Sequence, residues 1–89
     1  DLGPEPLDPG FTYERFQEIF SNRKGMVKTT FVNQEVIAGI GNCYSDEICF
    51  EAGIKPMRKF TELESSEFQA LFHGMKTVFH RAIEAGGYI

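Results

Sequence analysis

The sequence of 89 residues contains no tryptophan, only two cysteines and no long apolar run. A membrane-spanning helix needs about 20 consecutive apolar residues, and charged or polar residues break every apolar run of this chain well before that length. The 42% of residues that are hydrophobic suit one small soluble domain with a modest core, built largely from nine phenylalanines. We therefore expect no membrane among the partners of this protein.

The two cysteines, Cys43 and Cys49, are six residues apart, which is too far for a disulfide within one helix. Six residues of helix span about 9 Å, whereas a disulfide needs Cα atoms within about 7 Å of each other. Unpaired thiols are typical of a reducing compartment, so we predict a cytoplasmic protein. There is no CxxC pair, and His73 and His80 would lie about 10.5 Å apart along a helix, too far to share one metal ion. We expect no metal or cofactor in this chain.

The chain also lacks a surplus of basic residues. It has nine lysines and arginines but thirteen acidic residues, which gives a net charge of −4. Diffuse attraction to nucleic acid usually requires a basic surplus. The basic residues nevertheless gather in two groups, Arg23, Lys24 and Lys28, and Lys55, Arg58 and Lys59. A locally basic face on an acidic domain is one hypothesis, and a solvated loop is the alternative for the second group.

The apolar spacing predicts an all-α fold, a small bundle of about four helices. Thr12 is expected to cap a first helix, in which Tyr13, Phe16, Ile19 and Phe20 share one face. Residues 26–32 are predicted as a short helix, although Lys28–Val32 suits a strand by composition.

A further helix is predicted from about Cys43 to Ala52, ended by Gly53 at the position that follows a helix. The last helix has apolar residues at three- and four-residue steps from Phe68 to Ile83. Ser65 or Ser66 is expected to cap it, and Gly86 to end it.

The first ten residues contain three prolines and two glycines, a composition typical of a linker. We predict an interdomain linker over residues 1–10 and one domain over residues 11–89. Because Asp1 is not an initiator residue, we expect the chain to be a piece of a longer protein.

The most informative motif is Gly39-Ile40-Gly41-Asn42, which directly precedes the third predicted helix. Glycines let the backbone turn tightly and approach a ligand closely, and Asn42 is a good N-cap. The helix would direct free N–H groups and a partial positive charge at the turn, which is a general way to hold a phosphate. The motif therefore predicts a phosphate-bearing partner, and in this context DNA.

With its surroundings, this motif resembles the formamidopyrimidine-DNA glycosylase and endonuclease VIII family. The resemblance is to the middle domain of that family, a bundle containing a helix–two-turns–helix motif, and it covers nearly the whole chain. The matching pieces are Leu2–Leu7, Lys28 at fourteen residues before Asn42, Glu47, Ala52–Pro56 and Ala82–Gly87.

The resemblance implies the DNA-binding domain of a base-excision-repair enzyme that removes oxidised bases and cleaves the strand at an abasic site. The resemblance implies that Asn42 of this chain, with Gly39 and Gly41 of the turn, binds a phosphate near the flipped lesion. Lys28 would lie on the DNA side. Cys43 stands where the family commonly has a bulky aliphatic residue near the damaged base, and this departure leaves the lesion preference open. The implied partner is double-stranded DNA with a damaged base or an abasic site, bound by a monomer.

The family's catalytic proline and glutamate belong to a preceding domain, so no catalytic residue is assigned in this chain and we expect it to be inactive alone. The family's zinc finger would follow it, so no zinc ligand is assigned either. We expect Cys43 to be buried and Glu47 to interact favourably with the start of its helix. Two alternatives stay open. One is a non-catalytic nucleic-acid-binding module of the same fold, similar to those of a ribosomal small-subunit protein and a type II topoisomerase, and the other is a protein-interaction bundle.

Overall fold

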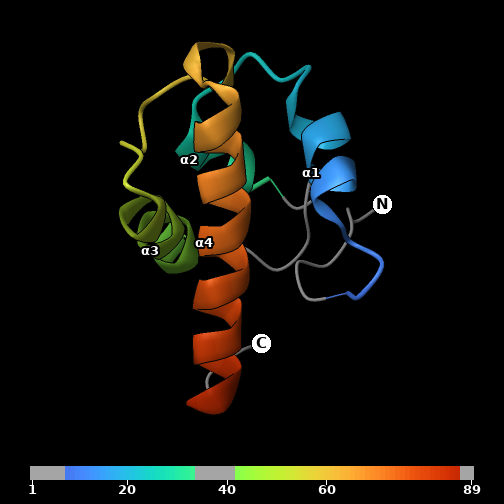
Figure 1. Ribbon diagram of the computed structural model, residues 1–89. Coiled ribbons are helices and arrows are strands. Elements are labelled where there is room, and N and C mark those ends of the chain that lie inside the picture. The colour runs from blue at the N-terminus through green and yellow to red at the C-terminus, as the bar shows by residue number, and fades with distance from the viewer. Residues whose placement is uncertain (1–7, 34–41, 87–89) are drawn as a thin grey trace.

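The computed structural model describes residues 8–33 and 42–86, without the side chain of Asn42. The described helices are α1 (Tyr13–Phe20), α2 (Val27–Phe31), α3 (Asn42–Ala52), the short 3-10 helix η1 (Phe60–Glu62) and α4 (Ser65–Glu84). The predicted all-α bundle of about four helices is confirmed. The long helix α4 runs through the molecule, and α1 and α3 lie on opposite sides of it (Figure 1). Among the described helices, none has the length and apolar character needed to cross a membrane.

Local signals in the sequence define three of the helix ends. The Thr12 hydroxyl accepts a hydrogen bond from the Arg15 N–H at 3.3 Å and caps α1 as predicted. Gly53 and Gly86 have φ values of +73° and +76°, the left-handed conformation that favours glycine after a helix. Both therefore end their helices, α3 and α4, as predicted.

The prediction that Ser65 or Ser66 caps α4 is wrong, because the helix starts one residue earlier. The N-cap is Glu64, and its N–H donates to the Glu67 carboxylate at 2.9 Å. This contact satisfies a backbone donor that the helix leaves unpaired. Ser65 and Ser66 thus lie inside the first turn of α4.

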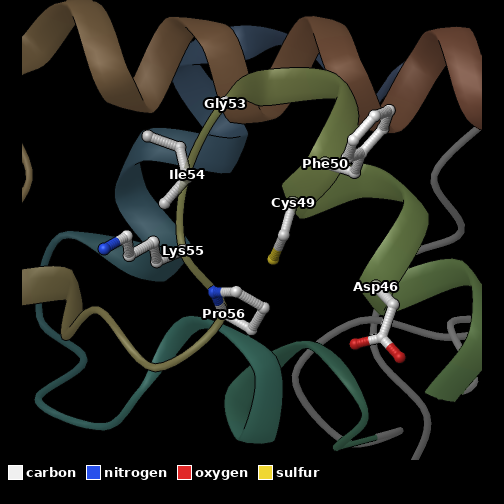
Figure 2. Close-up of a pocket in the computed structure, with 7 residues that line it drawn as sticks. All are labelled: Asp46, Cys49, Phe50, Gly53, Ile54, Lys55 and Pro56. Atoms are coloured by element: carbon white, nitrogen blue, oxygen red, sulfur yellow. The ribbon is translucent and has the colours of Figure 1, made fainter.

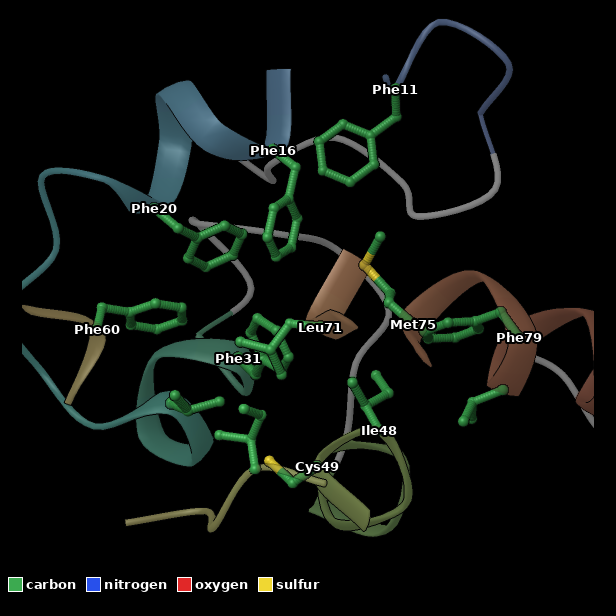
Figure 3. Close-up of a cluster of buried hydrophobic side chains, with 13 residues drawn as sticks. Phe11, Phe16, Phe20, Phe31, Ile48, Cys49, Phe60, Leu71, Met75 and Phe79 are labelled. Atoms are coloured by element: carbon green, nitrogen blue, oxygen red, sulfur yellow. The ribbon is translucent and has the colours of Figure 1, made fainter. Parts of the chain in front are cut away.

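The core is a cluster of buried apolar side chains contributed by every helix (Figure 3). Phe16 lies near its centre, with its ring centroid 4.7 Å from that of Phe20 and 5.5 Å from that of Phe72. Among the residues that the structure describes, thirteen apolar ones are buried: Phe11, Phe16, Phe20, Val27, Phe31, Ile48, Cys49, Ile54, Phe60, Leu71, Met75, Val78 and Phe79.

The apolar stripe of α4 belongs to this core as predicted, except at its end. Ile83 is 49% exposed, because the last turn of α4 extends past α1 and α3 (Figure 1). The stripe therefore supplies core residues along most of the helix but leaves its C-terminal end uncovered by the described elements.

The short helix α2 confirms the helical prediction for residues 26–32, and the strand alternative is wrong. Its first two N–H groups, of Val27 and Lys28, donate to the carbonyl oxygens of Arg58 at 2.8 Å and Pro56 at 3.0 Å. A helix leaves these donors without partners of its own. The segment after α3 therefore caps α2 and fixes its position.

Helices α3 and α4 pack closely at Gly74. A Cβ atom placed on Gly74 would lie 3.2 Å from the Ile48 carbonyl oxygen and 3.5 Å from the Ala52 Cβ atom. The absence of a side chain at this position therefore allows the backbone of α4 to approach α3. This approach sets the position of α3 and of the functional candidates on it.

We predict that Gly74→Val lowers the free energy of unfolding by about 1–3 kcal/mol, since an added side chain would press on the α3 backbone. Chemical denaturation measures this change. Thr77→Val is the matched control, because Thr77 is exposed on the same helix and should tolerate the same side chain. A Gly74→Val variant as stable as the control would contradict the close approach.

Candidate nucleic-acid interface

The candidate phosphate site lies at the start of α3. The helix begins at Asn42, which is therefore its first helical residue and not the N-cap residue that was predicted. A difference of one residue is within the usual variation of helix assignments. Gly39 and Gly41 lie outside the described residues, as does the Asn42 side chain. The first turn of a helix has unpaired N–H donors and a partial positive charge, which suit an anion.

Lys28 lies beside the N-terminal half of α3. Its Nζ atom is 3.0 Å from an Asp46 carboxylate oxygen, and the two side chains are 39% and 54% exposed. Asp46 follows Asn42 by four residues, so the two share one face of the helix, one turn apart. The fold thus brings Lys28 next to the candidate phosphate site, but already paired with an acid. Asp46 was not predicted from the sequence, although its four-residue spacing from Asn42 was a signal.

The prediction that Cys43 is buried is wrong, since its side chain is exposed. The inner face of α3 carries Ser45, Ile48 and Cys49, all of which are buried. At 100° per residue, Cys43 falls on the opposite face, together with Phe50. An exposed Cys43 in the first turn remains available to a ligand bound at the start of α3.

Glu47 is also exposed, and the prediction that it interacts favourably with the start of its helix is wrong. The first turn of α3 contains no acidic residue, and Glu47 lies in the second turn. The effect of the helix dipole on a charge falls off within the first turn. Glu47 lines a shallow hollow with Tyr44 and Arg81, on the side of α3 that faces α4.

A groove of about 470 Å³ runs between α3 and the segment that follows it. Its wall contains apolar side chains of Cys49, Ile54 and Pro56, with Asp46 and Lys55 on opposite sides (Figure 2). Burial, and then the charge of Asp46, raise the pKa of the Cys49 thiol to about 11, while Lys28 opposes this shift. Cys49 is therefore a protonated core residue and not a nucleophile.

The described part of the chain contains no cluster of side chains typical of a metal site. No three His, Cys, Asp or Glu side chains come together there in a way that could hold a metal ion. His73 and His80 are both exposed on α4.

In the second basic group, Arg58 is engaged in a structural network. Its guanidinium donates to the Glu67 carboxylate at 3.0 and 3.2 Å and to the Glu62 carbonyl oxygen at 3.0 Å. The hydrogen bonds to Glu67 raise the pKa of Arg58, and they are the main reason that the pKa of Glu67 is lowered. Lys55 and Lys59 are exposed and make no ion pair within the described part of the chain. Arg58 thus holds the loop to α4 and is not a free cation.

The chain is similar to known proteins over nearly its whole length. Residues 2–89 match the model of the formamidopyrimidine-DNA glycosylase H2TH domain, where H2TH stands for helix–two-turns–helix. The chain is 40% identical to the formamidopyrimidine-DNA glycosylase of Listeria innocua over 86 residues, which are 97% of this chain and 32% of that protein. The chain therefore spans about a third of the length of the curated relatives it matches.

Two solved structures of similar proteins share the fold of this chain. The MutM (Fpg) protein from Thermus thermophilus superposes with a TM-score of 0.90 at 34% identity, covering 97% of this chain and 32% of that one. The Lactococcus lactis Fpg, solved in complex with DNA containing an abasic site, superposes with a TM-score of 0.88 at 30% identity over the same shares.

The Arg58–Glu67 contact predicts a pH-dependent stability. We expect Glu67→Gln to lower the melting temperature by a few degrees at pH 7, because glutamine keeps an acceptor for the Glu64 N–H but loses the charge. A carboxylate with a lowered pKa stabilises the fold above its unfolded pKa of about 4.3, and this effect is lost as the pH falls through the lower folded value. The difference between the two proteins should therefore shrink below about pH 4.

Thermal melts from pH 3 to pH 7 measure this difference, with Glu18→Gln as the control. Glu18 pairs with Arg15 at 3.3 Å, but both side chains are well exposed, so its loss should change little. A Glu67→Gln deficit that stays constant over this pH range would contradict the role of the charge.

Proposed function

Because the chain belongs to the formamidopyrimidine-DNA glycosylase H2TH domain family, we propose that it is the DNA-binding domain of a base-excision-repair glycosylase and abasic-site lyase that acts on oxidised bases. The observation that carries the proposal is the start of α3 at Asn42, with the Lys28 ammonium beside the same helix. Free N–H groups and a nearby cation suit a DNA phosphate. The DNA complexes of the Lactococcus lactis relative support this partner.

In this proposal Asn42, Gly41 and Gly39 hold a phosphate, Lys28 lies on the DNA side and Cys43 faces the region of the lesion. Flipping a damaged base costs a few kcal/mol, and the domain helps by clamping the distorted backbone. Residues 1–10 serve as a linker and residues 11–89 as the binding domain. The domain acts as a monomer in the cytoplasm, needs no cofactor of its own and has no catalysis by itself.

A protein-interaction bundle is the second candidate function. It is favoured by Phe50, whose side chain is 88% exposed beside the groove, since exposed apolar patches often mark interaction sites. The two functions differ in a titration with duplex DNA at low salt. No response to DNA would favour the second candidate.

We predict that Asn42→Ala weakens binding to a duplex with an abasic site by about 1.5–3 kcal/mol, the value of a hydrogen bond to a charged group. Fluorescence anisotropy measures the affinity, and thermal melting must accompany it, because the start of α3 also changes. Gln17→Ala is the matched control, an exposed amide on α1, across α4 from α3 (Figure 1). Unchanged affinity in a folded Asn42→Ala variant would refute the phosphate role.

We also predict a shallow dependence of DNA affinity on salt. Each phosphate neutralised by a cation contributes about −0.9 to the slope of log affinity against log salt. One or two such contacts give roughly −1 to −2, and Lys28→Ala should make the slope shallower by up to about one unit. The neutral N–H groups of the turn should add little. A slope steeper than about −4 would instead indicate a larger basic face that includes the exposed residues Arg23, Lys24, Lys55 and Lys59.

A further inference from the structure

The Lys28–Asp46 ion pair lies beside the proposed phosphate site and bears on its strength. The Lys28 Nζ atom is 3.0 Å from the Asp46 carboxylate, so the cation expected to meet DNA already has an anionic partner. Both side chains are partly exposed, at 39% and 54%. An ion pair this accessible to water contributes little net stability and exchanges partners readily.

The position of Asp46 also matters for an incoming phosphate. It lies four residues after Asn42, which is about 6 Å along the helix axis and on the same face. A carboxylate at that distance repels an anion bound at the start of α3, and less so while Lys28 neutralises it. The phosphate and Asp46 therefore compete for one ammonium group.

We propose that Asp46 is a built-in competitor of the DNA phosphate, a carboxylate that holds Lys28 in the free protein and weakens DNA binding. This inference rests on the proposed function. When Lys28 moves to a phosphate, Asp46 loses its partner and takes up a cation from solution. That uptake offsets part of the counterion release that normally accompanies phosphate neutralisation. Asp46 thus lowers both the affinity and its salt dependence.

The test is Asp46→Asn in the full 89-residue chain, which keeps the size of the side chain and removes its charge. We expect binding to a duplex with an abasic site to tighten about two- to five-fold at low salt. We also expect the salt slope to steepen by up to about one unit. Asp46→Glu keeps the charge and should show no gain. Binding by Asp46→Asn that is unchanged or weaker would overturn the inference.

Two further variants separate competition for Lys28 from a general change in charge. Glu51→Gln makes the same charge change on the same helix, where Glu51 pairs with Arg81 at 3.1 Å, and it should not tighten binding. In a Lys28→Ala background the competition for Lys28 is absent, so only the direct repulsion between Asp46 and the phosphate can contribute, and we expect a smaller gain from Asp46→Asn than in the presence of Lys28. A gain at least as large as in the presence of Lys28 would mean that Asp46 acts without Lys28, and the proposed route would be wrong.

The same measurements distinguish failure of this inference from failure of the proposed function. If Asn42→Ala and Lys28→Ala weaken binding while Asp46→Asn does not strengthen it, only the inference fails. If neither Asn42→Ala nor Lys28→Ala changes binding, the proposed site fails and the inference falls with it. Thermal melting of every variant shows whether it is folded.

Discussion

The position of the candidate site depends on two backbone hydrogen bonds, from the N–H groups of Val27 and Lys28 to the carbonyl oxygens of Arg58 and Pro56. Helix α2 has only five residues, too few to be stable alone in water. Its first donors are satisfied by a segment about thirty residues later in the chain, and Arg58 in turn is held by Glu67. The same interactions that make α2 a helix therefore place the Lys28 side chain beside α3.

Local chemistry allowed much of the fold to be predicted from the sequence. Thr12 and the glycines Gly53 and Gly86 act on their immediate neighbours, so the helix ends they define could be recognised without a structure. The three- and four-residue spacing of apolar residues in α4 also identified its buried face. These signals depend on a few adjacent residues and not on how the chain folds back on itself.

The wrong prediction for Cys43 has its physical origin in the composition of helix α3. Helix α3 carries apolar residues of its own on every side, including Cys43 and Phe50 on its exposed face, whereas its polar residue Ser45 is buried. Its sequence therefore does not define which face turns inward, and the burial of Cys43 could not be judged. The inward face is selected by α4, whose Gly74 admits the α3 backbone near Ile48. That selection is a property of packing between helices.

The sequence did not show which basic side chains are paired with acids, because this too depends on how the helices pack. A net charge of −4 does not reveal which cations are free, because Lys28 and Arg58 are paired with acids that lie 18 and 9 positions away in the chain. Neutral N–H groups at a helix start can hold a phosphate without adding positive charge. Under the proposed function, an acidic domain can therefore clamp DNA if those donors position the backbone and a single exchangeable lysine supplies the charge. The affinity would then depend on geometry at the start of α3 more than on the total charge of the domain.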